Sequence, residues 1–333
     1  MAIKPDICLI ICTFNRPEGL RRILDCCVRQ IATCALSCEI VVSDNSPSGY
    51  ANSVIASLDA HGVSIHCVQS APGNISRARN KGISASSADI IIFLDDDMTV
   101  CDNWISIMHA ALEEHEADCA LSSLVPVSEN KIPVQGMSAA FFSRLLAMPD
   151  GTCVSPGKKS GMAYVSVATS GTIWRRATCF TDALPFDPEF GASGGEDCDL
   201  FLRLENRRKK IIWCGSAISY EWVPPGRMTF RYLLMRAFGG GQIFVGVLVK
   251  NSRHPRLSSL KWIGIGLLQC IGGGVMLGGM GMLSVIAPKK FRNTFISLAF
   301  REAAAIGKIT WFRKYPTYKV EHEMNKSLKV NDL

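Results

Sequence analysis

The chain has 333 residues, 48% of them hydrophobic, which suits one large folded domain or a domain with a substantial appendage. Its net charge of +7 is unevenly distributed: residues 1–200 carry 14 Lys and Arg against 23 Asp and Glu, and residues 201–333 carry 22 against 6. A basic half of this kind is typical of a surface that faces phosphates, although a solvated basic surface without a partner would have the same composition. No nucleic-acid recognition motif accompanies the charge, so no nucleic acid is expected as a partner.

The fourteen cysteines occur singly or in unpatterned pairs, and none forms a Cys-x-x-Cys pair. Several of them, including Cys8, Cys12 and Cys67, lie inside apolar runs, where a free thiol behaves as a small hydrophobic side chain. This usage favours a reducing compartment and argues against a secreted disulfide scaffold. The first residues show no basic segment followed by an apolar one, so no secretory signal is expected.

Strand-like and helix-like segments alternate over the first hundred residues. Ile7–Cys12 is an apolar run of the length of a buried strand, and apolar residues at helical spacing follow it from Leu20 to Val28, with Pro17 suited to the first turn of that helix. The further elements expected here are strands over Glu39–Val42, Ser64–Val68 and Ile90–Leu94 and a helix over Ile75–Ser84. This alternation predicts an α/β fold in which helices cover both faces of a mainly parallel sheet.

The middle of the chain, residues 119–220, is less regular. Strand-like runs are expected at Tyr164–Ala168 and Thr172–Trp174, and a helix-like run follows the motif Gly194–Asp199 as far as Arg208. The domains that we expect are one over 1–225, with halves 1–118 and 119–225, and a basic helical region over 226–333.

Trp262–Ile286 differs from the rest of the chain, because its 25 residues carry no charge and only one strongly polar side chain, Gln269. This length exceeds the roughly 20 residues that cross a bilayer as a helix. The basic residues that flank its two ends are Arg253, Arg256, Lys261, Lys289, Lys290 and Arg292. A simple span would place one basic cluster outside, so a re-entrant or interfacial segment is favoured over a span. A buried, glycine-rich helix of a water-soluble protein is the third interpretation.

Polar residues follow three of the expected strands, at Asn15-Arg16, Asp44-Asn45 and Asp95–Asp97. In a parallel sheet all three positions lie at the carboxyl edge, where such folds bind their ligands. Three adjacent carboxylates repel one another, which predicts a nearby cation. Carboxylate oxygens suit Mg²⁺ or Mn²⁺, ions that are often held by one or two carboxylates together with substrate phosphates. A solvated acidic turn would show the same triplet, so the triplet alone does not decide.

Five segments occur in an order that is typical of a known family: Cys12–Pro17, Val42–Ser46, Gly73–Gly82, Phe93–Met98 and Gly194–Asp199. On these segments the first 200 residues resemble family 2 of the glycosyltransferases, and in detail the chain is similar to bacterial exopolysaccharide transferases of the succinoglycan (ExoM-like) type. The resemblance implies the GT-A (Rossmann-like) fold and an inverting hexosyltransferase. It also implies a nucleotide-sugar donor, expected to be a UDP-sugar, and a lipid-linked saccharide acceptor.

The resemblance further implies roles for individual residues near the carboxyl edge. Asp44 would accept a hydrogen bond from the nucleotide base, and Asp97 would hold the metal ion, Mg²⁺ or Mn²⁺, against the leaving diphosphate. The other donor-binding residues that it implies are Thr13, Asn15, Arg16, Asn74, Arg79, Asn80, Asp95 and Asp96. Each of these residues could instead cap a helix or form a turn.

The family's general base is an aspartate in the Gly194–Asp199 motif, which corresponds to Asp197. A general base takes the proton of the acceptor hydroxyl as the hydroxyl oxygen attacks the anomeric carbon. Glu196 would bind or orient the acceptor, and Asp199 is more typical of an acid at a helix start. Many relatives carry a histidine further along the chain where this sequence has Glu221, so Glu221 either replaces a metal-side ligand or is structural.

Three arginines follow, and Arg227 and Arg231 are expected on one helical face, with Arg236 further round. They would bind diphosphate, or they would lie on an amphipathic helix against anionic headgroups. Together with the apolar segment they predict association with an anionic membrane surface, at the cytoplasmic face of the bacterial inner membrane. The alternative function is a non-catalytic nucleotide-sugar-binding or assembly subunit of a polysaccharide complex, which need not retain both Asp97 and Asp197.

Overall fold

The computed structural model describes residues 4–128, 132–155, 159–160, 163–164, 168–286 and 288–313. The chain divides into two compact units. The first unit contains the large sheet and its covering helices, and the second contains Gln135–Phe141, Ala192–Gly195 and the chain from Pro224 onward. The expected domains 1–225 and 226–333 remain a prediction.

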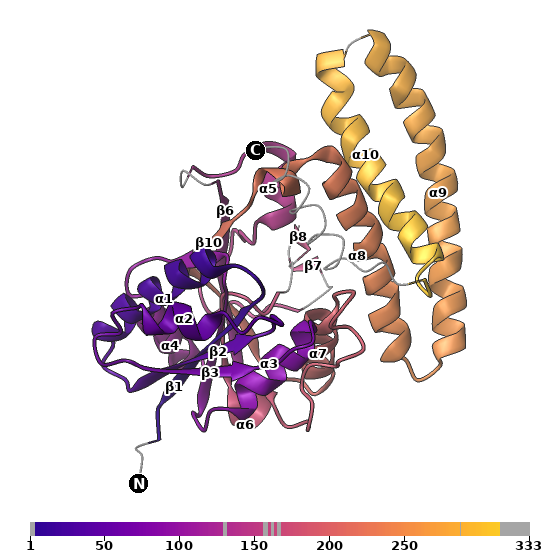
Figure 1. Ribbon diagram of the computed structural model, residues 1–333. Helices are drawn as coiled ribbons and strands as arrows, with labels where there is room; N and C mark the ends of the chain where they lie inside the picture. The colour runs from indigo at the N-terminus through magenta and orange to yellow at the C-terminus, as the bar shows by residue number, and fades with distance from the viewer. Residues whose placement is uncertain are drawn as a thin grey trace. The chain divides into compact units, whose positions relative to one another are not determined.

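Within the described residues, eight strands of the first unit form one sheet in the order β3-β2-β1-β4-β9-β6-β10-β5 (Figure 1). Their bounds are β1 Ile7–Thr13, β2 Cys38–Asp44, β3 Ser64–Gln69, β4 Ile90–Asp95, β5 Met98–Val100, β6 Cys119–Val127, β9 Thr172–Arg175 and β10 Ile211–Trp222. Only β9 and β5 run antiparallel to their neighbours in this sheet of described strands, so the expectation of a mainly parallel sheet is confirmed. A separate pair joins β7 (Lys159–Ser160) to β8 (Ala163–Tyr164).

The alternation of side chains along β1 explains why helices cover both faces of the sheet. The odd-numbered residues from Ile7 to Ile11 pack into one apolar cluster, and the even-numbered residues from Cys8 to Cys12 pack into another. The helices of the first cluster are α1 (Pro17–Ala32), α2 (Ala51–Ala56) and α4 (Trp104–Glu114), and those of the second are α3 (Ile75–Ser84), α6 (Arg176–Cys179) and α7 (Glu196–Asn206). The expected α/β architecture is confirmed.

Most of the elements expected from the sequence differ from the structure only at their ends. The helix over Ile75–Ser84 has the bounds that were expected, and the second strand extends beyond Glu39–Val42 by one residue before and two after. The helix-like run after Gly195 ends at Asn206, two residues before Arg208. Residues 165–167 of the expected strand Tyr164–Ala168 lie outside the described residues.

The second unit consists mainly of three long helices. Its elements are α5 (Gly136–Phe142), the 3₁₀ helix η1 (Pro225–Met228), α8 (Phe230–Lys250), α9 (Pro255–Ile286) and α10 (Pro288–Ile309). Helix α10 packs against both α8 and α9 (Figure 1). By length and composition α8 and the segment Pro255–Met280 of α9 could each cross a membrane.

Helix α9 is continuous over its 32 residues, a length of about 48 Å. The large apolar side chains that it exposes are Leu257, Leu260, Leu267, Leu268, Ile271, Val275 and Met276. These side chains contradict the interpretation of a buried helix. The re-entrant and interfacial interpretations of this segment stay predictions, and by length and composition the helix could also cross a membrane. The side chains of Lys289, Lys290 and Arg292 lie outside the described residues.

Candidate active site

Three parallel strands end side by side at one edge of the sheet. Strand β1 pairs with β2 on one side and with β4 on the other, in a register that sets Thr13 beside Asp44 and Cys12 beside Asp95. The polar segments that follow these three strands are therefore neighbours in space, as the sequence predicts for the carboxyl edge of such a sheet.

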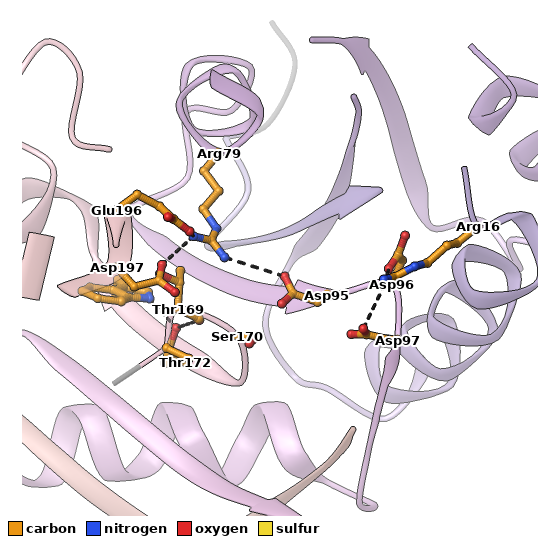
Figure 2. A network of polar contacts seen from close by, with 12 residues as sticks. Arg16, Arg79, Asp95, Asp96, Asp97, Thr169, Ser170, Thr172, Glu196 and Asp197 are labelled. Atoms are coloured by element: carbon orange, nitrogen blue, oxygen red, sulfur yellow. Dashed lines mark hydrogen bonds and ion pairs between the residues drawn. The ribbon is translucent and has the colours of Figure 1, made fainter. Parts of the chain in front are cut away.

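Arg16 pairs with two of the three adjacent aspartates of the acidic loop, Asp95–Asp97 (Figure 2). Its Nη1 lies 2.8 Å from Oδ1 of Asp96 and 2.8 Å from Oδ2 of Asp97. The side chain of Asp96 is 5% exposed and that of Asp97 is 18% exposed, while that of Arg16 is 37% exposed. Arg16 directly precedes α1, which begins at Pro17, so the start of this helix sets the position of the arginine.

Arg79 of α3 pairs with three carboxylates that come from two other parts of the chain (Figure 2). Its Nη1 lies 2.8 Å from Oε1 of Glu196 and 2.5 Å from Oδ1 of Asp197, and its Nη2 lies 4.0 Å from Oδ1 of Asp95. Arg79 and Glu196 are almost completely buried. Because Asp95 begins the acidic loop, the clusters around the two arginines are continuous. We call the whole set the charged row: Arg16, Arg79, Asp95, Asp96, Asp97, Glu196 and Asp197.

Burial changes the proton affinity of the charged row. It raises the pKa of Asp95 to about 6 and that of Glu196 to about 7; neighbouring carboxylates add to this effect and Arg79 opposes it. Burial also raises the pKa of Asp96. Burial alone would lower the pKa of Arg79, but the carboxylates around it, Asp197 foremost, raise that pKa above its ordinary value. Near neutral pH the charged row therefore carries less than its full negative charge.

Residues 8–157 match the family model described as glycosyl transferase family 2. Residues 8–157 are thus similar to this family, and the chain is a glycosyltransferase. Succinoglycan biosynthesis protein ExoM of Rhizobium meliloti is 28% identical to it over 253 residues, which cover 74% of this chain and 76% of that protein. The residues that match the family model include Arg16, Arg79 and the acidic loop, whereas Glu196 and Asp197 lie beyond them.

Two solved structures resemble the glycosyltransferase in fold. TarS of S. aureus, in complex with UDP, has a TM-score of 0.52 at 15% identity, over 93% of this chain and 91% of that one. Mannosyltransferase PcManGT from Pyrobaculum calidifontis, in complex with GDP-Man and Mn²⁺, has a TM-score of 0.58 at 14% identity, over 94% and 89% of the two chains. At these identities the likeness shows the fold alone, and it confirms the expected GT-A fold.

The charge argument for a metal ion in the glycosyltransferase needs correction. The acidic loop does not depend on a metal for its counter-charge, because Arg16 and Arg79 already supply two cations. In the part of the chain that the structure describes, no group of three or more His, Cys, Asp or Glu side chains could hold a metal ion. The donor atoms still fit Mg²⁺ or Mn²⁺, because Asp97 offers a partly exposed carboxylate and these ions often use one or two carboxylates with substrate phosphates.

Two residues expected to bind the donor, Asp44 and Asn80, make hydrogen bonds within the fold. Asp44 is fully buried, and its carboxylate accepts the backbone N–H of Ser46 at 2.9 Å and that of Ala51 at 3.1 Å. Asp44 thus holds the turn that follows β2, and its contact with a nucleotide base stays a prediction. Asn80 donates to the carbonyl of Phe186 at 2.6 Å and accepts its N–H at 2.9 Å, so its amide holds that loop.

Asn74 and Asn15 differ in what they leave for a ligand. Asn74 caps α3, because its Oδ1 accepts the N–H of Arg77 at 3.0 Å while its Nδ2 donates to the carbonyl of Pro188 at 3.0 Å. It has the capping role that the sequence left open. Asn15 adopts a left-handed backbone conformation with φ of 54°, and it is exposed. Asn15 therefore stays a candidate donor-binding residue.

Tyr50 belongs to the site although no motif marks it. Its hydroxyl hydrogen-bonds that of Thr13 and accepts the backbone N–H of Arg16 at 3.0 Å. Thr13 is buried and also donates to Oδ2 of Asp96 at 2.8 Å. Thr13 thus holds the Asp96 carboxylate of the acidic loop, and its expected role as a donor ligand stays a prediction.

Glu221 lies next to the acidic loop. It pairs in register with Met98, and the N–H of the following residue, Trp222, donates to the carbonyl of Asp97 at 2.7 Å. Asp199 has the structural role that its place at a helix start suggested, because it pairs with Arg203 at 2.9 Å one turn along α7.

The arginines of the second unit do not share a helical face. Arg227 is buried in η1, which ends at Met228, and α8 begins only at Phe230. The expected i, i+4 relation of Arg227 and Arg231 is therefore wrong, because the two residues lie in different elements. Arg231 and Arg236 are both exposed on α8.

Proposed function

We propose that the glycosyltransferase moves a hexose from a UDP-sugar to a hydroxyl of a lipid-linked saccharide, with inversion, in bacterial polysaccharide biosynthesis. The similarity to ExoM, a succinoglycan biosynthesis protein, and the likeness in fold to TarS, solved with UDP, support this proposal. The observation that carries it is the charged row, in which Arg79 links Asp197 to the acidic loop.

In the proposed reaction Asp197 is the general base. As the acceptor oxygen forms its bond to the anomeric carbon, the bond from that carbon to the donor's phosphate oxygen breaks, and the electron pair leaves with the diphosphate. The acceptor proton passes to a carboxylate oxygen of Asp197. Attack from the side opposite the diphosphate inverts the anomeric centre. Arg79 holds the carboxylate in place, and Glu196, its neighbour in the charged row, orients the acceptor.

The charges of the site support a role for a cation when the donor is bound. The charged row holds five carboxylates against two guanidiniums, and a nucleoside diphosphate would add further negative charge. Mg²⁺ or Mn²⁺ held by Asp97 would offset this charge and stabilise the leaving diphosphate. Four of the donor-binding residues expected from the sequence remain exposed or partly exposed: Asn15, Arg16, Asn74 and Asp95.

The second unit supports a place at the membrane. Helix α9 exposes apolar side chains over most of its length, and α8 carries the exposed arginines Arg231 and Arg236 near its start. Such a combination suits a bilayer whose surface is anionic. The proposed location is the cytoplasmic face of the bacterial inner membrane, where a lipid-linked acceptor would be met.

The test is transfer and hydrolysis of UDP-sugars by the purified chain, scored by product mass. Asp197→Asn should lower transfer at least a hundredfold while UDP still binds. The matched control is Asp102→Asn, an exposed aspartate between β5 and α4 that is outside the charged row. Retained transfer in Asp197→Asn would overturn the assignment of the base.

The same assay tests the metal and the alternative function. EDTA should stop transfer, and Mg²⁺ or Mn²⁺ should restore it; full activity in chelator would remove the metal from the proposal. A folded wild-type chain that binds nucleotide but turns over no donor would instead favour the non-catalytic subunit.

A further inference from the structure

A buried arginine, Arg144, lies beneath the turn 168–171. The residue is 2% exposed, and its backbone forms an antiparallel bridge with Leu124 of β6. Its guanidinium donates to four backbone carbonyls: Nε to Ser122 at 2.8 Å, Nη1 to Ala168 at 3.1 Å, and Nη2 to Ser170 at 2.9 Å and to Gly171 at 3.1 Å. Three of these four carbonyls belong to the turn.

This use of a cation is costly. Among the described residues no carboxylate lies within ion-pair distance of Arg144, and a buried charge without such a partner destabilises a fold. Burial lowers the pKa of Arg144 to about 10, although more distant carboxylates such as Asp197 act in the opposite direction. The guanidinium is a rigid, planar group with several N–H donors, so it can fix several carbonyls in one geometry.

The turn is also fixed from its other end. The hydroxyl of Thr172 donates to the carbonyl of Thr169, and Nε1 of Trp174 donates to that hydroxyl at 2.6 Å. Gly171 has a left-handed φ of 68°, and a Cβ there would lie 2.8 Å from Oγ of Ser122 and 3.1 Å from Nη2 of Arg144. The backbone of the turn is therefore held on both sides in a shape that only glycine permits at residue 171.

The rigid turn positions one hydrogen-bond donor, the hydroxyl of Thr169, toward the proposed base Asp197. The buried hydroxyl of Thr169 donates to Oδ1 of Asp197, the same oxygen that pairs with Arg79 (Figure 2). Both described bonds of the carboxylate thus fall on one oxygen. The other charged groups near the carboxylate are Arg79 of α3, Glu196 of α7, Asp95 at the end of β4 and Arg144 itself.

We propose that Arg144 is a positioning residue that acts through Thr169. The guanidinium holds the turn so that the Thr169 hydroxyl fixes Oδ1 of Asp197, which assigns Oδ2 to the proton of the acceptor hydroxyl. This inference rests on the proposed function, because it requires Asp197 to be the base.

The test compares Thr169→Val, which keeps the shape and removes the hydroxyl, with Thr169→Ser, which keeps the hydroxyl. Thr169→Val should lower kcat about tenfold to a hundredfold and leave the KM for the donor unchanged. It should also move the acidic limb of the kcat–pH profile to higher pH, because a hydrogen bond to the ionised carboxylate is lost. Thr169→Ser should restore both quantities to within about threefold of the wild type.

Arg144→Lys keeps the positive charge and removes the planar set of guanidinium donors. It should therefore shift the acidic limb of the kcat–pH profile in the same direction as Thr169→Val. UDP binding and the unfolding temperature would confirm that the variant is folded. A wild-type kcat and pH profile in Thr169→Val, with Asp197→Asn inactive, would overturn the inference and leave the base in place. Transfer that survives in Asp197→Asn would instead mean that the proposed function itself has failed.

Discussion

Arg79 has its guanidinium among carboxylates that reach it from α7 and from the end of β4, and almost none of it contacts water. A buried ion without partners destabilises a fold by several kcal/mol, so each member of this cluster is stable there only because the others are present. Protonation of one carboxyl group therefore changes the charge interactions of all the others. Glu196 is the member that should report this most directly.

We expect Glu196 to make folding depend on pH. Its pKa rises from 4.5 to about 7 on folding, so between these values the folded chain holds a proton that the unfolded chain releases. Stability therefore falls as pH rises through this window, and the loss is complete above pH 7, at on the order of 1–3 kcal/mol. Glu196→Gln removes this titration. Its unfolding temperature should fall less between pH 5 and 7.5 than that of the wild type.

The control for this measurement is Glu114→Gln, which changes an exposed glutamate of α4 and should leave the wild-type pH dependence intact. Identical pH dependence in the wild type and in Glu196→Gln would contradict the raised pKa.

At the residue scale, side-chain types could be predicted from the sequence but their partners could not. A triplet of aspartates after an apolar strand marks a position at the carboxyl edge. Nothing in the sequence shows that Arg16, 80 residues before Asp96, pairs with two of the three aspartates. For Asp44 the sequence predicted the place at the sheet edge correctly. It did not predict that the carboxylate accepts hydrogen bonds from the turn that follows.

At the scale of elements, strand β9 shows what an apolar run leaves undetermined. The run Thr172–Trp174 predicted a strand, and the structure has one over Thr172–Arg175. Its direction is set by pairing with β4 and β6, both antiparallel to it, which no local pattern records. An antiparallel strand brings its first residues to the edge where parallel strands have their last. Thr169, just before β9, therefore reaches Asp197.

Helix α8 lies in the region 226–333 that was expected to be helical, and it contains three successive glycines, 239–241. The structure gives one of them a clear function. A Cβ at Gly241 would overlap the carbonyl of Ala304 in α10, whereas a Cβ at Gly240 would have no atom within 4 Å. Close approach of two helices at a small residue is typical of helices that pack in membranes.

The neighbouring glycines supply a matched pair of variants. Gly241→Ala should force α8 and α10 apart and destabilise the second unit by about 1–3 kcal/mol. Gly240→Ala should be neutral or stabilise by up to about 1 kcal/mol, because alanine favours a helix over glycine. Thermal unfolding followed by helical circular dichroism would separate the two; equal effects would mean that α8 and α10 do not pack in this way.

At the scale of the whole molecule, we expect membrane binding to depend on the exposed side of α9. Leu268, Ile271 and Val275 are 72%, 68% and 74% exposed, so their replacement by glutamine removes apolar surface without removing internal packing. The triple variant should lose most of its flotation with anionic liposomes and keep its unfolding temperature. Leu184→Gln, an exposed leucine of the first unit, should float like the wild type. Undiminished flotation of the triple variant would place the anchor elsewhere.

The sequence is acidic in its first 200 residues and basic in the rest, and the structure shows which features contain these charges. The acidic half contains the carboxylates of the charged row, and the basic half contains the helices of the second unit. Composition could not say that five of the 23 Asp and Glu of the first 200 residues gather around two arginines, because the partners in that cluster come from segments that are distant in the chain.

The exposed apolar side of α9 would determine how the enzyme encounters its two substrates by diffusion. Seven large side chains on one helix represent on the order of 10 kcal/mol of transfer free energy, so a chain anchored through them would rarely leave the lipid. It would then encounter a lipid-borne acceptor by lateral diffusion in two dimensions, while the nucleotide sugar arrives from bulk solution in three. Dilution of the bilayer with inert lipid should therefore slow the enzyme even when the total amount of acceptor is constant.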